Sequence, residues 1–583
     1  MNADSFDRIV LAVTVTVRSP FLFPGLDAGR FGLDAAALRD AEARPLIPSD
    51  QMRGVLRHAL QDIADAEKFD AAELAAMFGK GSADAREANE NSADAFSPAR
   101  GQLHFSDLVM QGDSAGAVAN RVRIDNETRA ADRGGLLFVE LVAEPGHDVE
   151  FKGQVVIHAA RNRSDKWIRA LRAAATRVSA IGAMKTAGYG EVVSFDISED
   201  TKAHRPVFRK CDVPRDLVTY RLTIDRPFLV NARRAADNVY AGSTIIPGGA
   251  LKGLLARHLE LMGKLDADIP DSLNALAISH ARVEGDEGVL PLSLVAEGTD
   301  IADALCVPLG EGAMIGDRAA AFSSDWKSGT FASARRALGR GEPVALDRSV
   351  RMHVEIARET GTAEDQRLFI ANAVDPGKNR WIAQIDFEAV KNEDHRRLFA
   401  GVIEAGMDGL GRTGARVDFE RVAGPANAGA ANKALPVGGV ANRFAIVLQT
   451  DAVMVSPSDA ADAKAAYDAY WNRVCPGVTV ENFYASQRLA GGYIARRFGS
   501  GAYSPFWLTE AGSVFLLSGE GLADRMRGLL RSGLPAPVIG GKSTTWQTCP
   551  FQPENGYGAI SADYDPSPLW EKVAQPWGKV AHV

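Results

Sequence analysis

Residues 44–60, RPLIPSDQMRGVLRHAL, and residues 243–259, STIIPGGALKGLLARHL, are closely similar stretches of one chain. In each, an Ile-Pro pair precedes apolar residues at helical spacing, and proline is favoured where a helix opens. Repetition of a whole helix start predicts a duplicated domain, because each copy carries its own apolar face.

Two further matches follow in the same order along the chain. The stretch RVRIDNETRAADRGGLLFVELVAEPG (121–146) matches RMHVEIARETGTAEDQRLFIANAVDPG (351–377), and GYGEVVSF (188–195) matches RTGARVDF (412–419). Each copy therefore shows a strand, a loop, a helix, β segments, a second helix, a glycine turn and a strand. This order predicts an α+β fold with antiparallel sheets and helices packed on one face.

The domain boundaries follow from composition. We place copy one at about 1–205, copy two at about 214–425 and a third section at 440–583. The polar run 201–216 and the Ala- and Gly-rich run 424–439 are the expected joints.

Composition limits the class of protein. A chain of 583 residues is too long for one core, and its 46% hydrophobic and 24% charged residues are ordinary for a soluble protein. The apolar start, residues 9–17, alternates like a strand, so we expect neither a signal peptide nor a membrane span. Four scattered cysteines indicate a reducing, cytoplasmic setting without a cysteine metal site. The net charge of −8 still allows a basic groove on an acidic body.

Both helix starts have features of a phosphate site. Free N–H groups bind anions, and a cation beside a glycine lies one turn into each helix: Arg53 and Lys252. The alternative is a helix whose exposed face carries basic residues without a ligand. The glycine turns at 181–192 and 409–417 also suit a phosphate backbone. Further candidate contacts from these helices and turns are Arg57, Arg257, Lys185, Gly188, Gly190, Arg412 and Arg416.

The copies differ in the loop before the first helix. In copy one, residues 20–48 form a long loop punctuated by glycine that carries Asp27, Asp34 and Asp40, whereas copy two is shorter here. Such a loop is a candidate active site, although an aspartate in a loop more often caps a turn. The sequence contains no zinc-ligand cluster, and GGKSTTW (540–546) lacks the spacing of a nucleotide-binding loop.

Together these motifs resemble the RAMP superfamily, the RNA-binding subunits of CRISPR effector complexes. The resemblance rests on IPSDQMRGVLR, IPGGALKGLLA, MFGKG (77–81), RVRIDNETRAADRGGLLFVE and GYGEV. It implies tandem ferredoxin-like (RRM-like) domains with insertions and a β-rich C-terminal section. Copy one is most similar to the backbone subunit of type III complexes. Copy two with residues 440–583 is similar to the cap-forming five-type subunit of type III-D complexes, which implies a backbone–cap fusion.

The resemblance also implies a function. The chain would bind a guide RNA, including its 5′ tag, within a complex of other CRISPR effector subunits, and would cleave complementary target RNA. The spacing of Gly32, Asp34 and Asp40 before Ile47-Pro48 assigns cleavage to Asp34, with Asp40 and Asp27 as neighbouring candidates. The cofactor would be Mg²⁺ or another divalent ion shared with the RNA. The family's thumb corresponds to residues 117–138, which adds Arg121, Arg123 and Arg129 to the candidate RNA contacts, and the GYGEV turn adds Tyr189.

Two other functions fit the same residues. The chain could be a scaffold that binds guide RNA and cuts nothing, which differs from the first hypothesis only at Asp34. It could also be a guide-processing endonuclease that works without metal through histidine. His58 and His258 are the candidates for that role, although both lie near apolar helix faces.

Overall fold

The structure is a computed structural model of the chain. It describes residues 6–576 except 26–31, 65–68, 81–98, 115, 126, 232, 237, 267, 287, 299, 309–310, 321–333, 337, 342–343, 357–362, 424–433, 457–461, 493–504 and 538–547. Asp27 and most of the predicted joint at 424–439 lie outside these described residues.

Residues 6–199, which we call module 1, contain one antiparallel sheet covered by helices. Its strands pair in the order β10-β1-β9-β6-β2, with β5 also paired to β9. Numbered along the chain, the four main strands lie in the order 4-1-3-2 with a helix after the first and third, which is the ferredoxin-like arrangement. The elements are β1 (Phe6–Arg18), β2 (Leu46–Ile47), α1 (Ser49–Asp62), α3 (Ala71–Phe78), β5 (Leu103–Phe105), β6 (Leu108–Met110), β9 (Asp148–Ala160), α4 (Arg161–Ala175) and β10 (Glu191–Glu199).

Residues 217–422, module 2, repeat this arrangement. The sheet order is β14-β22-β11-β24-β23, with β15 also paired to β22. The elements are β11 (Leu217–Ile224), α5 (Gly248–Leu261), α6 (Ile269–Ala275), β14 (Ala277–Ile278), β15 (Arg282–Val283), β22 (Trp381–Asp386), α8 (Glu393–Ala405), β23 (Met407–Leu410) and β24 (Ala415–Val422). The duplication predicted from the two Ile-Pro helices, α1 and α5, is therefore present in the fold.

Residues 443–564, module 3, repeat it once more. Sheet order β27-β30-β25-β31 again places the strands as 4-1-3-2, with helices after the first and third. The elements are β25 (Arg443–Leu448), α9 (Ala463–Val474), β27 (Thr479–Tyr484), β30 (Val514–Ser518), α11 (Leu522–Ser532) and β31 (Ile560–Tyr564). The sequence predicted only a β-rich section here, since no Ile-Pro helix start precedes α9.

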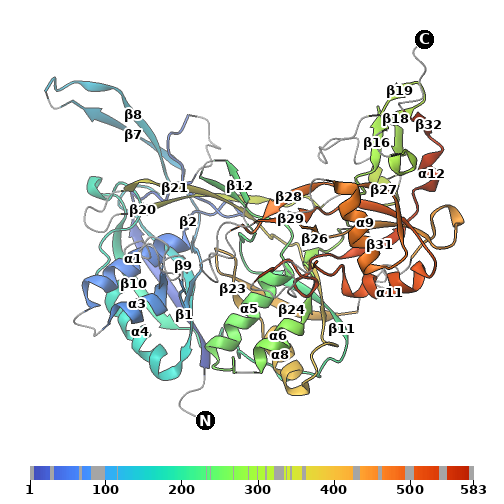
Figure 1. Ribbon diagram of the computed structural model, residues 1–583. Coiled ribbons are helices and arrows are strands. Elements are labelled where there is room, and N and C mark those ends of the chain that lie inside the picture. The colour runs from blue at the N-terminus through green and yellow to red at the C-terminus, as the bar shows by residue number, and fades with distance from the viewer. Residues whose placement is uncertain are drawn as a thin grey trace.

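Each module carries an insertion between its second and third main strands. In module 1 it is the hairpin of β7 (Ala117–Ile124) and β8 (Ala131–Leu141), which projects away from the body in Figure 1. In module 2 it includes β20 (Arg348–Ile356) and β21 (Ala363–Val374), which run across the side of module 1 (Figure 1). In module 3 it contains β28 (Gln487–Ala490) and β29 (Phe506–Thr509).

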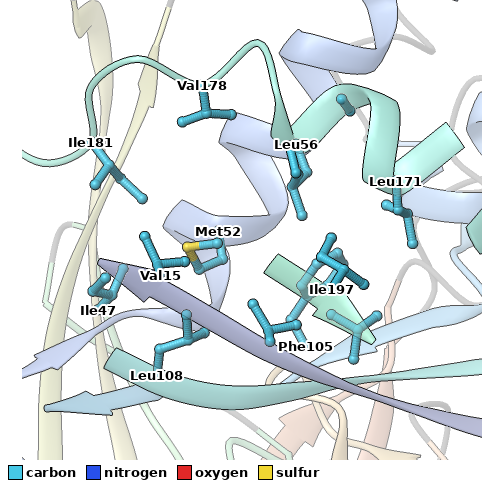
Figure 2. Close-up of a cluster of buried hydrophobic side chains, with 14 of the residues drawn as sticks. Val15, Ile47, Met52, Leu56, Phe105, Leu108, Leu171, Val178, Ile181 and Ile197 are labelled. Atoms are coloured by element: carbon cyan, nitrogen blue, oxygen red, sulfur yellow. The ribbon is translucent and has the colours of Figure 1, made fainter. Parts of the chain in front are cut away.

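Three main hydrophobic clusters, one in each module, hold the fold together. In module 1, Met52 and Leu56 of α1 point at the sheet residues Val15 and Phe105, as Figure 2 shows. Burying side chains of this size stabilises a fold by roughly 1.5–3 kcal/mol each. Among the helices that the structure describes, none combines the length and apolar character that crossing a bilayer requires.

Candidate functional site

The loop that carries Asp34 is fixed to the foot of the first hairpin. The Asp34 N–H donates to the Phe138 carbonyl at 2.9 Å, and the Phe138 N–H donates to Asp34 Oδ2 at 2.7 Å. Ala35 then forms a parallel bridge with Val139, so this segment lies alongside β8. The exposed carboxylate of Asp34 is thus held in place by the backbone of the hairpin.

The glycine turn of module 1 lies beside this loop. Gly188 and Gly190 have φ values of 81° and 74°, a region that only glycine adopts freely. The Gly190 N–H donates to the Pro20 carbonyl at 2.8 Å, and the Ile181 N–H donates to the Gly190 carbonyl at 2.8 Å. A Cβ at Gly190 would overlap the Ile181 carbonyl oxygen, so no other residue fits there.

Arg121 and Tyr189 connect the turn to the hairpin. The guanidinium carbon of Arg121 on β7 lies 5.2 Å from the centre of the Tyr189 ring, at a distance typical of a cation–π contact. The Tyr189 ring packs in a cluster with Val139 and Leu141, and Ala35 packs against the same cluster. The structure therefore brings Asp34, Arg121 and the glycine turn together at the foot of the β7–β8 hairpin.

Three further cations lie on the hairpin and the glycine turn, Arg123 and Arg129 toward the hairpin tip and Lys185 in the turn. Arg123 is about 80% exposed, although its Nε lies 3.4 Å from Asp132. Arg129, with φ 55°, is exposed between β7 and β8, and Lys185 is exposed in the glycine turn. This side of module 1 therefore presents positive charge next to backbone N–H groups, which suits a phosphate backbone.

Asp40 has a different environment from Asp34. Its Oδ1 accepts the N–H groups of Glu42 at 3.1 Å and Arg44 at 2.8 Å, and its Oδ2 accepts from Arg44 Nε at 2.8 Å. These are the hydrogen bonds of an aspartate that caps a turn. Asp34 is therefore the better candidate for the carboxylate that contacts a ligand.

The predicted phosphate sites at the helix starts are filled from within the protein. The Ser49 N–H of α1 donates to Asp107 at 2.8 Å, and the Gly248 N–H of α5 donates to His280 Nδ1 at 3.1 Å. Asp107 is held in turn by Arg351 of module 2, at 2.9 and 2.6 Å. Each helix start is therefore a contact inside the chain, and we withdraw the prediction that it binds phosphate.

Two cations that the sequence assigned to RNA are buried. Lys252 is 8% exposed, its ammonium donates to the Asn274 carbonyl at 3.2 Å, and burial lowers its pKa to about 8. Arg416 is also buried and pairs with Asp408 at 3.1 Å and Asp418 at 2.8 Å. Both groups are enclosed by the protein, so we remove them from the candidate RNA contacts.

The remaining sequence candidates lie outside the foot of the hairpin. Arg53 of α1 is half exposed and lies 3.3 Å from Asp50, and Arg57 lies one turn further along that helix. Arg257 pairs with Glu260 at 2.7 Å, and the guanidinium of Arg412 lies over the Tyr240 ring at 4.8 Å. Of these, only Arg412 lies in a glycine turn.

A buried charged cluster that the sequence did not reveal joins modules 1 and 2. Asp408 of β23 pairs with Arg8 of β1 at 2.7 Å and lies 3.0 Å from His158 Nε2, in addition to its contact with Arg416. Burial alone would raise the pKa of Asp408, but these hydrogen bonds outweigh it and hold the pKa well below its ordinary value. Beside the cluster, burial lowers the pKa of His258 to about 4.

The residues that cap the helix starts were also missed. Ser106 and Ser279 make the same pair of hydrogen bonds in modules 1 and 2, with Gln154 and Gln384 respectively. The helix cap follows each serine, as Asp107 in one module and His280 in the other. The dipeptides Ser-Asp and Ser-His, 59 and 33 residues after the Ile-Pro pairs, were too short a signal to detect.

Comparison with known proteins matches part of the chain. The model of the RAMP superfamily matches residues 14–193. No curated protein sequence matches the chain. Among solved structures, one chain of a type III-B Cmr-beta complex bound to cognate target RNA matches at 15% identity, with a TM-score of 0.24, over 33% of this chain. The match spans 61% of that chain, less than two thirds of its length. The residues that match this family model include the Asp34 loop, the first hairpin and most of the sheet of module 1.

Proposed function

We propose that the chain is a subunit of a type III CRISPR ribonucleoprotein that binds guide RNA and cleaves complementary target RNA at Asp34. The observation that carries this proposal is the convergence of Asp34, Arg121 and the glycine turn at the foot of the first hairpin. Positive side chains and backbone N–H groups there suit a phosphate backbone of any sequence. The carboxylate of Asp34 beside them can take part in cleavage of that RNA backbone.

The two hairpins supply a second support. Each exposes a row of apolar side chains on one face, and the rows correspond at a constant difference of 232 in residue number. Single exposed apolar residues are normal on a protein surface. A row of them that recurs at corresponding positions in two modules instead indicates a surface that binds another molecule. We propose that these rows lie against bases of the guide–target duplex and separate them. The corresponding pairs are Val118 and Val350, Val122 and Val354, Ile124 and Ile356, and Leu136 and Leu368.

The chemistry assigned to Asp34 follows from its position. Separation of two bases frees the ribose 2′-hydroxyl of the target to attack the adjacent phosphorus in line. The bond from phosphorus to the 5′-oxygen breaks, a 2′,3′-cyclic phosphate forms, and the leaving 5′-oxygen takes a proton from water. Asp34 would accept the proton of the attacking hydroxyl, with one carboxylate oxygen oriented by the Phe138 N–H. The cations near the foot would hold the phosphate during this step.

A divalent ion fits this site only if RNA supplies most of its ligands. Among the described residues, no group of three His, Cys, Asp or Glu side chains could hold a metal ion. Mg²⁺ is commonly held by one or two carboxylates together with phosphates and water, so Asp34 suits such a shared ion. When bound, the ion would neutralise charge that develops on the phosphate.

Modules 2 and 3 would bind the guide at its 5′ tag. Arg412, stacked over Tyr240, is the exposed cation of the glycine turn in module 2 and the proposed contact. The guide-processing alternative has less support, because His258 is buried and its Nε2 lies 3.0 Å from the Asp408 carbonyl.

The test compares Asp34→Asn with Asp40→Asn in the complex assembled with guide RNA and the other effector subunits. We expect Asp34→Asn to slow cleavage at this subunit's position by about 10²–10⁴-fold, the usual contribution of a general base. Guide and target binding, measured by filter retention, should not change, since the carboxylate acts on the transition state. Retained cleavage in Asp34→Asn would leave the scaffold function as the better description.

A further inference from the structure

Helix α4 of module 1 carries far more positive than negative charge. Between residues 161 and 177 the chain has six Lys or Arg and one acidic residue, Asp165, whereas the whole chain has 66 basic and 74 acidic residues. One side of α4 packs into the core through residues such as Trp167 and Leu171. The other side faces solvent and carries a row of basic residues, three exposed and the first half-buried. We call this set the α4 row: Lys166, Arg169, Arg172 and Arg177.

The cations at the start of α4, outside the row, are paired with carboxylates. Arg161 lies 3.2 Å from Asp165 and 3.3 Å from Glu199. Arg163 lies 2.9 Å from Glu73. The helix dipole makes a cation unfavourable at a helix start, and these carboxylates offset that cost.

Most of the α4 row is not neutralised in this way. Among the residues that the structure describes, neither Arg169 nor Arg177 pairs with a carboxylate. Arg172 Nε donates to the Ile197 carbonyl at 2.8 Å, and a carbonyl carries no counter-charge. The helix dipole favours Arg172 and Arg177 at the end of the helix, but it does not account for Arg169 in the middle. The row therefore offers charge that is free to attract an anion.

The corresponding helices of the other modules show that the fold does not require this charge. α4 contains five Lys or Arg and one Asp, whereas α8 of module 2 contains two Arg and three acidic residues. α11 of module 3 contains three Arg and one Asp, and its Arg531 lies 3.1 Å from Asp386 of module 2. A second helix of either charge thus fits the fold, and the large excess is particular to α4.

The α4 row leads away from the foot of the β7–β8 hairpin. α4 ends just before the glycine turn at 181–192, whose Gly190 N–H donates to the Pro20 carbonyl after β1. Arg177 is therefore the end of the row nearest the turn, in which Lys185 is exposed. In Figure 1, α4 lies on the side of module 1 away from modules 2 and 3, below the projecting hairpin. Positive charge thus continues from the turn onto the outside of module 1.

A row of cations without apolar neighbours suits a nucleic acid backbone. From Lys166 to Arg177 the row is about 16 Å long, because a helix rises about 1.5 Å per residue. A protein partner usually buries apolar or aromatic side chains at the centre of its interface. Among the described residues, α4 contributes none of the large exposed hydrophobic side chains. Phosphates repeat along a strand and attract cations whatever the base sequence.

We propose that the α4 row binds the phosphates of single-stranded target RNA that extends beyond the guide–target duplex. The strand leaves the foot of the hairpin beside Lys185 and continues past Arg177 along α4. One face of a single helix suits one strand, and the target is the strand whose length the guide does not limit. The inference rests on the proposed function only for the identity of the strand, because the charge and course of the row belong to the chain itself.

The test compares targets with and without an unpaired extension. The complex is assembled with guide RNA and the other effector subunits, and the Kd is measured by filter retention. One target matches the guide only, and two others carry about 20 further nucleotides at the 5′ or the 3′ end, enough to cover the row. We expect one of the two extensions to tighten binding about tenfold. Arg169→Ala with Arg177→Ala should remove this gain and leave the Kd of the short target unchanged.

Two variants control for folding and for total charge. Arg169→Lys with Arg177→Lys keeps both charges and should keep the gain. Arg525→Ala with Arg527→Ala removes two exposed arginines of α11 and should also keep it. Against log salt, the slope of log Kd for the extended target should fall by about 1.4 in the α4 alanine variant, at roughly 0.7 for each phosphate contact.

Several outcomes would overturn the proposal. They are no gain from either extension in the wild type, a gain that the α4 alanine variant keeps, and an equal loss in the α11 variant. If the α4 alanine variant loses another subunit in native mass spectrometry, α4 is a protein-docking face instead. If it weakens binding of duplex DNA but not of extended RNA, the ligand is DNA. Binding and cleavage of the short target report on the proposed function at Asp34, so its failure is distinguishable from failure of the α4 row.

Discussion

The interface between modules 1 and 2 and the interface between modules 2 and 3 join corresponding faces of the modules through different chemistry. We call them the first and the second seam. The first seam encloses charges: Asp408, Arg8 and Arg416 lie buried together between modules 1 and 2. The second seam also contains ion pairs, but at its centre a glycine turn lies on a neutral imidazole, His280. The difference shows that the docking geometry belongs to the module, whereas the interactions that stabilise each seam belong to particular residues.

The largest expected effect is at the first seam. Asp408→Asn leaves two guanidinium groups buried without their main counter-charge, which should cost about 3–5 kcal/mol. Hydrogen exchange of the backbone amides of β5 and β23 measures how readily the interface between modules 1 and 2 opens. Asp418→Asn is the matched control, because Asp418 pairs with the same Arg416 but is 43% exposed. It should cost less than about 1 kcal/mol. Equal effects of the two variants would contradict the importance of the buried cluster.

A smaller effect is expected from the glycine turn at the second seam. Gly556→Ala places a Cβ against His280 at a φ of 90°, so overlap adds to backbone strain, for a total of about 3 kcal/mol. Gly188→Ala has a similar φ of 81° but no atom within 4 Å of its Cβ, and strain alone costs about 1–2 kcal/mol. Urea unfolding of both variants compares the docked turn with the open one. A larger loss for Gly188→Ala would contradict this comparison.

Acid should weaken the second seam by about 2 kcal/mol at pH 5. Burial lowers the pKa of His280 to about 4 from an ordinary value of 6.5. The unfolded chain therefore takes up a proton between these values that the folded chain does not, and stability falls as the pH drops. His280→Asn keeps a hydrogen-bond acceptor without titrating, so the seam should lose this pH dependence.

The protection of α5 amides from hydrogen exchange at pH 7 and pH 5 checks this prediction. Protection in the wild type that does not change between the two pH values would contradict it. The first seam should weaken over the same range through His258, which titrates at about 4.

Local patterns predicted the parts of the fold that local residues determine. The Ile-Pro helix starts correctly indicated α1 and α5, and the order of elements indicated the repeated α+β sheet. Module 3 was not recognised because α9 begins at Ala463 without an Ile-Pro start. A signal was present, since Gly556-Tyr557-Gly558 repeats the Gly188-Tyr189-Gly190 turn, but three-residue matches arise too easily by chance to be decisive.

The roles of single cations depended on contacts between modules. Arg8 and its partner Asp408 are separated by 400 residues, and no spacing rule connects them. Lys252 and Arg416 occupy motif positions that suit RNA, yet packing between and within modules encloses them. Asp34 lies beside the hairpin and glycine turn because the loop pairs with β8. Its catalytic role stays a prediction.

Residues 293–307, the plug that contacts Asn482 of β27, also affect the order in which the chain folds during synthesis. Val307 and its partner Asn482 are 175 residues apart, so the plug leaves the ribosome well before β27 exists. At about 5–20 residues per second, that delay is roughly 10–35 seconds. During this time the apolar side of residues 293–307, including Val295 and Ala302, lacks Tyr484 and Val573, which pack against it in the folded chain. The nascent chain therefore passes through an interval in which module 2 exposes apolar surface. Slow translation of module 3 would lengthen this interval, in which the chain can bind chaperones or aggregate.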